Sequence, residues 1–213
     1  MTQAFRVDGG ASLDRACPLS FTFDGVAYGG YEGDTLASAL LASGVRLVGR
    51  SYKYHRPRGI LSAGPEEPNA LVGVSRGPGR FTPNLRATQV ELYDGLVATS
   101  QNRWPSLAFD VGAINDVFSP LYGAGFYYKT FMGPDLFGKN WAWKNLYEPI
   151  VRLAAGLRTA PTELDPDRYT RYFDPCDVLI VGAGPAGLGA ALLRARAGRT
   201  SSSATRIPRW AAR

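Results

Sequence analysis

The sequence DVLIVGAGPAGLGAALL, residues 177–193, constrains the fold of this chain more than any other segment. Its apolar run DVLIV is typical of a strand that is buried on both faces of a parallel sheet. The run leads directly into glycines with the spacing GxGxxG, and the small and apolar residues after them predict a helix. Strand, glycine turn and helix together predict the first βα unit of an α/β dinucleotide-binding domain of the Rossmann type.

The glycine loop is the candidate cofactor site, and each glycine has its own physical role. Gly182 permits the tight turn, Gly184 lets pyrophosphate approach the backbone, and Gly187 lets the helix pack against the strand. The helix N-terminus then offers free N–H groups to the phosphates. The alternative is a glycine-rich turn that binds nothing. The predicted cofactor-binding residues are Gly182, Ala183, Gly184, Pro185, Ala186 and Gly187.

The two residues between the second and third glycines bear on which dinucleotide is bound. Pro185 and Ala186 resemble the motif of flavoprotein oxidoreductases more than that of other dehydrogenases. This favours FAD or NAD in a flavoprotein-type domain, and the sequence leaves the choice between them open.

The residues after Leu193 do not continue this domain as expected. A second strand should follow and end in Asp or Glu about 20 residues after the first glycine. Residues 194–213, RARAGRTSSSATRIPRWAAR, have neither an apolar run nor an acidic residue, and they contain six arginines. We therefore expect no second strand, and we interpret residues 194–213 as an aberrant tail from a frameshift or misplaced gene end. A genuine short protein with an unusual tail is the alternative.

The formal charge of +6 arises in that tail, because residues 1–193 carry 18 basic and 18 acidic side chains. A neutral body argues against nucleic acid as a partner. The loop GRSYKYHRPRGILSAGPEEP, residues 49–68, does mix basic and aromatic residues as nucleic-acid sites do. We expect a structural or subunit-contact role for it instead, and contact with a cofactor phosphate or carboxylate from elsewhere in an assembly is the alternative. We do not expect His55 to be a catalytic base, since no recognisable motif places a carboxylate or nucleophile beside it.

The inventory of metal ligands is small. Cys17 and Cys176 are too far apart for a CxxC spacing, and His55 is the single histidine. We therefore predict no metal ligands and no iron–sulfur cluster. The sequence also lacks a signal-peptide pattern and any run of about 18 apolar residues, which predicts a cytoplasmic protein with no membrane partner.

The first 100 residues predict a compact α+β domain of the β-grasp kind. LSFTF and VAYGGY, joined by Asp24 and Gly25, predict a hairpin. GDTLASALLASG predicts a helix with Asp34 or Thr35 as N-cap and Gly44 beyond its end. VRLV, residues 45–48, is again extended, ALVGVS predicts a strand, and TQVELYDGLVATS predicts a second hairpin.

An aromatic-rich connector follows this domain. Residues 104–147 hold twelve aromatic side chains without a sustained period. We expect a helix from Asn140, kinked or divided at Pro149, and an exposed apolar patch that a partner covers. The predicted organisation is a β-grasp domain over 1–100, a connector over 101–174, and a truncated dinucleotide-binding domain over 175–213.

Three segments carry a resemblance to a known family. GDTLASALLASGVRLVGRSYKYHRPRGILSAGPEEPNALV, the aromatic connector and CDVLIVGAGPAGLGAAL together resemble the amino-terminal part of the α subunit of heterotetrameric sarcosine oxidase. The resemblance covers residues from about 19 to 193. GRSYKYHRPRG and EEPNALV are more specific to it than the glycine motif.

The resemblance implies a 2Fe-2S ferredoxin-like fold without cluster cysteines, because related amine dehydrogenase subunits carry those cysteines in the loop after the helix. It also implies NAD (or FAD) at the glycine loop, FMN and FAD in the full complex, and assembly with β, γ and δ subunits. The implied reaction is oxidative demethylation of sarcosine to glycine, with formaldehyde (or methylene-tetrahydrofolate when tetrahydrofolate is present) and hydrogen peroxide as the other products. The corresponding subunit of an opine or imino-acid dehydrogenase and a non-catalytic docking module are the alternatives.

Overall fold

The chain divides into two compact units, Met1–Asp165 and Pro166–Arg213. The computed structural model describes residues 3–9, 13–121, 141–154, 168–171, 173, 175–182, 184–198 and 201–204.

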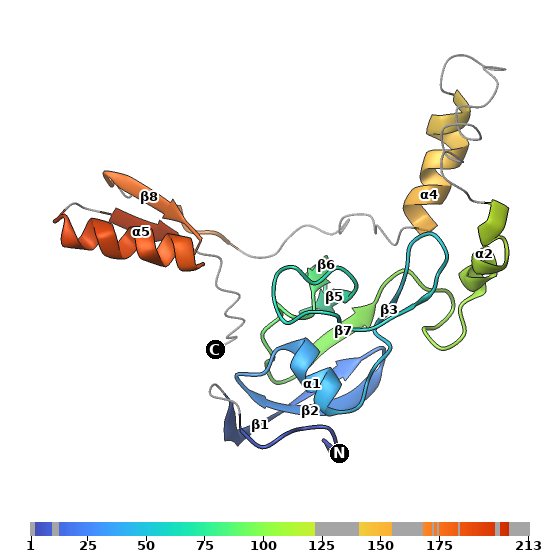
Figure 1. Ribbon diagram of the computed structural model, residues 1–213, viewed down its shortest axis with the longest axis horizontal. Helices are drawn as coiled ribbons and strands as arrows, with labels where there is room; N and C mark the ends of the chain where they lie inside the picture. The colour runs from blue at the N-terminus through green and yellow to red at the C-terminus, as the bar shows by residue number, and fades with distance from the viewer. Residues whose placement is uncertain are drawn as a thin grey trace. The chain divides into compact units, whose positions relative to one another are not determined.

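A five-stranded sheet forms the centre of the first unit (Figure 1). Its strands are β1 (Asp14–Phe23), β2 (Val26–Glu32), β5 (Leu71–Ser75), β6 (Phe81–Arg86) and β7 (Leu96–Ser100), in the spatial order β2-β1-β7-β5-β6. The central pair β1 and β7 is parallel, and the other pairs are antiparallel. With helix α1 (Leu36–Ala42) packed on the sheet, this arrangement confirms the predicted α+β domain.

Local sequence signals account for the first hairpin and the helix. Asp24 and Gly25 join β1 to β2 with φ values of 50° and 80°, the left-handed region that a two-residue hairpin turn requires. Thr35 is the N-cap of α1, where its hydroxyl accepts a hydrogen bond from the Ser38 N–H. The Ser38 hydroxyl in turn accepts a hydrogen bond from the Thr35 N–H. Gly44, with φ 81°, follows the end of the helix.

The core lies between α1 and the sheet. Leu36 and Leu40 of the helix pack with Phe21, Val72 and Leu96 of the strands, and all five side chains are buried. Burial of this apolar surface is the main favourable contribution to folding. The first unit therefore has its own hydrophobic core.

The predicted second hairpin is wrong. Of the segment TQVELYDGLVATS, only the second half forms a strand of the sheet, β7, which pairs with β1 and β5. The first half bonds the start of the helix instead: the Leu36 N–H donates to the Val90 carbonyl, and the Leu92 N–H donates to the Asp34 carbonyl. The first half of the segment therefore bonds backbone groups at the N-terminus of α1 and does not form a hairpin with the second half.

Three further elements differ from the sequence expectations. VRLV is not a strand, and the two-residue strands β3 (Gly49–Arg50) and β4 (Pro57–Arg58) pair just after it. The sequence did not predict β6, which contains Pro83. Proline cannot donate to a ladder, so it is tolerated here because β6 lies at the edge of the sheet.

The described part of the connector is made of short helical elements. They are η1 (Val111–Ala113), α2 (Ile114–Val117) and η2 (Ser119–Leu121). Residues 122–140, including Asn140 and most of the predicted aromatic patch, lie outside the described residues.

The helix around Pro149 is continuous rather than divided. It includes a π-helical stretch η3 (Trp143–Tyr147) followed by α4 (Glu148–Ala154). The Glu148 N–H donates to the Trp143 carbonyl, five residues earlier. A wider turn at this place fits Pro149, which has no N–H for the normal helical bond.

The second unit is a strand–helix–strand arrangement of β8 (Val178–Val181), α5 (Pro185–Arg196) and β9 (Ser201–Ala204). β9 pairs with β8 in parallel, so our expectation of no second strand is wrong. Backbone N–H and C=O groups form the hydrogen bonds of a strand pair. A run of serines can therefore form a strand although it has no apolar pattern. Among the described helices of the chain, none is long and apolar enough to cross a membrane.

Candidate functional site

The glycine turn lies between β8 and α5, as the sequence predicts. Gly182 has φ 105°, a conformation that side chains rarely adopt, and it reverses the chain at the end of the strand. Gly184 is extended, with φ −71° and ψ 172°, and it is the N-cap of α5. Pro185 takes the first helical position, where its missing N–H costs nothing.

The glycines of the turn differ in what surrounds them. A Cβ on Gly187 would lie 2.1 Å from the Gly182 carbonyl oxygen and 3.6 Å from Ile180, so this position has no room for a side chain. A Cβ on Gly184 would meet nothing within 4 Å. The tight packing and the open backbone therefore lie at the positions for which the sequence predicts them.

This geometry leaves an open helix N-terminus beside the second glycine. The first intrahelical bond of α5 runs from the Leu188 N–H to the Gly184 carbonyl, 2.9 Å apart. The N–H groups before Leu188 point toward the start of the helix, and they carry partial positive charge. Such a terminus can bind phosphate oxygens. Ala183 lies outside the described residues, and cofactor binding at this loop stays a prediction.

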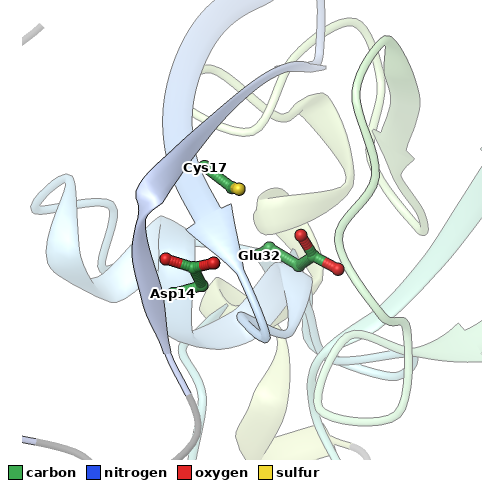
Figure 2. A group of neighbouring side chains, drawn as sticks. All are labelled: Asp14, Cys17 and Glu32. Carbon is green, nitrogen blue, oxygen red and sulfur yellow. The ribbon is translucent and has the colours of Figure 1, made fainter.

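A second group of side chains could hold a metal ion, and the sequence inventory missed it. Asp14, Cys17 and Glu32 offer ligand atoms that all lie within 4.8 Å of one another (Figure 2). Asp14 pairs with Glu32 across β1 and β2, and a register shift between Asp14 and Pro18 brings Cys17 to the same place. One thiolate and two carboxylates suit zinc or iron.

The two carboxylates also act on the thiol. Hydrogen bonding to Asp14 is the largest cause that raises the pKa of Cys17, and the charge of Glu32 raises it further. Negative neighbours disfavour a thiolate. Without a cation between these groups, Cys17 is therefore a slow nucleophile.

Replacing Asp14 by asparagine should therefore make Cys17 react several-fold faster with iodoacetamide at pH 8. The change removes a negative charge and a carboxylate acceptor while it keeps the shape of the side chain, so the pKa of Cys17 should fall. Mass spectrometry of the alkylated peptides measures the rate. Cys176 of the same molecule is the internal control, and an unchanged Cys17 rate would contradict the assignment.

Arginine side chains fix the position of the loop after α1. This agrees with the structural role that we expect for residues 49–68. The Arg50 guanidinium donates to the carbonyls of His55 and Leu107. Arg56 pairs with Asp116 and lies over the Tyr54 ring, 4.7 Å from its centroid. These contacts join the β3–β4 hairpin to the connector.

His55 does have a carboxylate beside it, which the sequence did not indicate. Its Nδ1 lies 2.6 Å from Asp110 Oδ2, and both residues are buried. The other Asp110 oxygen accepts from the backbone N–H groups of Trp104 and Gly112. The ring packs on Gly112, where a Cβ would lie 2.3 Å from Nδ1. The pair links the loop to the connector, although the two residues are 55 positions apart in the sequence.

The first unit matches a family model described as a 2Fe-2S iron-sulfur cluster binding domain, over residues 16–103. The match supports the ferredoxin-like fold. It contradicts our expectation that the chain carries no iron–sulfur cluster, and the Asp14, Cys17 and Glu32 group opposes it too. Cys17 is the one cysteine of the matched range, so those residues can supply at most one of the four thiolates that such a cluster usually takes.

The chain is also similar to much longer proteins. It is 62% identical to the sarcosine oxidase subunit alpha of Rhizobium meliloti (strain 1021), over 92% of this chain and 19% of that protein. It is 34% identical to the subunit of the same name from Corynebacterium sp. (strain U-96), over 89% of this chain and 14% of that protein. A solved L-proline dehydrogenase from P. horikoshii covers 89% of this chain and 25% of its own, at 19% identity and a TM-score of 0.40.

The similarity to these α subunits places the chain among the subunits of oxidoreductases. More specifically, it belongs to the family of sarcosine oxidase α subunits, which confirms the resemblance found in the sequence. The chain spans about a fifth or less of the length of the relatives it matches.

Proposed function

We propose that the chain is the amino-terminal part of an α subunit in a flavin-dependent oxidase that demethylates sarcosine. In this reaction sarcosine, oxygen and water give glycine, formaldehyde and hydrogen peroxide, and tetrahydrofolate can take the one-carbon unit as its methylene derivative. The observation that carries the proposal is 62% identity to a sarcosine oxidase α subunit over 92% of the chain.

The role of this chain in the complex is binding rather than chemistry. The open N-terminus of α5 beside Gly184 supports binding of the pyrophosphate of NAD or FAD in a Rossmann-type domain. A dinucleotide or flavin supplies hydride transfer when bound. The substrate, FMN and the second flavin belong to the β, γ and δ subunits or to their contacts with the α subunit in this proposal.

A chimera tests the proposed place of this chain in the complex. It joins residues 1–193 of this chain to the part of the Rhizobium α subunit that follows its matching segment, and it is co-expressed with the Rhizobium partner subunits. Assembly and sarcosine-dependent peroxide formation are measured. The chimera should assemble and form peroxide, and failure to assemble while the unaltered Rhizobium α subunit assembles would contradict the proposal.

The described connector favours docking as a further role. Trp104, Phe109, Ile114 and Val117 expose 58–75% of their surface, which is uncommon for such large apolar residues close together in a chain. Contact with a partner subunit would remove this surface from water. A docking role is compatible with the proposed sarcosine oxidase, and it does not depend on that proposal.

Changing Phe109 and Val117 together to aspartate should strongly reduce co-purification of the chimera with the partner subunits. Charges on a docking surface must lose their hydration on association, which weakens it. Leu61→Asp is the matched control, because Leu61 is 74% exposed and lies outside the connector. Affinity-tag recovery of the partners measures the effect; recovery that falls equally in the control, or in neither protein, would reject the docking surface.

A further inference from the structure

The loop of residues 49–58 and the connector form one joined surface of the first unit. The Arg56 side chain pairs with Asp116 of helix α2, with 2.6 Å between nitrogen and oxygen. The Asn115 side chain of the same helix donates to the Lys53 carbonyl, 3.4 Å away. These contacts hold the two segments side by side, so their exposed side chains meet a partner together.

Helix α2 has its polar residues toward this loop and its apolar residues toward water. Asp116 contacts the loop, whereas Ile114 and Val117 are 58% and 75% exposed. A surface helix normally shows the opposite arrangement, with the apolar side packed on the protein. Phe109 of the connector and Tyr52 of the loop are exposed as well. An exposed apolar group of this kind is typical of a surface that a partner covers.

The two segments carry a positive charge, although residues 1–193 as a whole are neutral. Residues 49–58 and 102–121 contain five basic and two acidic side chains. Both acidic side chains are engaged within the chain, since Asp110 contacts a histidine ring and Asp116 pairs with an arginine. The surface therefore combines an apolar centre with basic side chains beside it.

Basic and aromatic side chains also occur together at nucleic-acid sites, but two features favour a protein partner. Ile114 and Val117 are aliphatic, so they offer no ring on which a base can stack. Arg56 and Arg103 are already paired with carboxylates, which leaves few cations for the several phosphate contacts that a nucleic acid needs. An apolar centre with a charged rim is the usual anatomy of a protein–protein interface.

We propose that residues 49–58 and 104–118 together bind a face of another subunit that has an apolar centre and an acidic rim. Partner side chains would cover the apolar centre, and Asp or Glu of the partner would face Lys53 and Arg58. Complementary charges of this kind speed association and fix the register more than they add affinity. The inference rests on the docking role proposed above and adds the chemistry of the partner.

The salt dependence of association tests this inference. Binding of the chimera to the Rhizobium partner subunits is measured by surface plasmon resonance at 50 and 500 mM NaCl. The association rate constant should fall about tenfold or more over that range, because salt screens the attraction between opposite charges. Lys53→Glu together with Arg58→Glu should lower the rate constant about tenfold at 50 mM NaCl and remove most of its salt dependence. The dissociation rate constant should change much less.

Arg15→Glu together with Arg80→Glu is the matched control, because it makes the same change of charge at two exposed arginines outside both segments. An association rate constant that is independent of salt, or that falls equally in the control, would overturn the inference and leave the docking role intact. If the unaltered chimera does not bind the partners at all, the docking role fails and the inference fails with it.

A single-stranded DNA oligonucleotide serves as the competing probe. The full chain should bind it no better than the Lys53→Glu and Arg58→Glu variant does. Binding that this variant loses, with association of the partner subunits unchanged, would overturn the inference and assign the surface to nucleic acid.

Discussion

Glu67→Gln should lower the free energy of unfolding of the first unit by about 3 kcal/mol. The Glu67 side chain is buried, and its two oxygens accept hydrogen bonds from the backbone N–H groups of Leu61, Ser62, Asn69 and Ala70 at 2.6–3.2 Å. An amide would replace one acceptor by a donor that faces other donors. Urea unfolding at pH 7, followed by circular dichroism, measures the loss.

The same carboxylate makes the stability of this unit depend on pH. Burial alone would raise the pKa of Glu67, but the four backbone N–H groups together hold it below its ordinary value of 4.5. A carboxyl with a lowered pKa in the folded state stabilises the fold above the pKa of the unfolded chain. This contribution is lost as the pH falls through the folded-state pKa, and the variant should lack that part of the acid dependence.

Glu66 provides the matched control for this prediction. It is the neighbouring glutamate and it is exposed. Glu66→Gln should therefore change the unfolding free energy by less than about 0.5 kcal/mol. If Glu66→Gln and Glu67→Gln had the same effect, the network around Glu67 would not be the cause.

Gly184→Val in the chimera should weaken NAD or FAD binding by about 100-fold or more. A branched side chain would occupy the open space beside the N-terminus of α5, where pyrophosphate must approach the backbone. The 213-residue chain itself should bind either compound in the millimolar range or more weakly. Asp177 is its last acidic residue, so none follows to bond the ribose hydroxyls.

Gly189→Val separates this effect from a general effect on the helix. A Cβ on Gly189 also meets nothing within 4 Å, and the residue lies inside α5 rather than in the turn. Its replacement should leave the affinity almost unchanged. Titration calorimetry of both variants measures the difference, and equal affinities of Gly184→Val and Gly189→Val would contradict the role of the turn.

Local signals in the sequence were sufficient for the elements that local interactions determine. The Asp24–Gly25 turn, the Thr35 cap and the strand–glycine–helix segment all formed where their residues predict them. In each case the deciding groups lie within a few residues of one another. Backbone conformation and capping bonds depend on little else.

Long-range contacts explain what the sequence did not predict. Asp110 lies 55 residues from His55, and only the folded connector brings them together. Cys17 lies close to Asp14 and Glu32 because of a register shift between β1 and β2, and no periodic pattern in the sequence predicts that shift. β9 pairs with β8 in a parallel ladder, and its serine-rich sequence has no apolar pattern that would have predicted a strand. Register and partner choice were therefore the unpredictable part of the fold and of the candidate sites.

The most direct test of the central claim is the rate of sarcosine-dependent peroxide formation by the complex that contains the chimera. The same complex with the unaltered Rhizobium α subunit is the reference. If this chain is the amino-terminal part of a sarcosine oxidase α subunit, the chimera should assemble and turn over sarcosine within about tenfold of the reference rate, a difference of about 1.4 kcal/mol in the activation barrier. A chimera that assembles with its partners and forms no peroxide from sarcosine would contradict it.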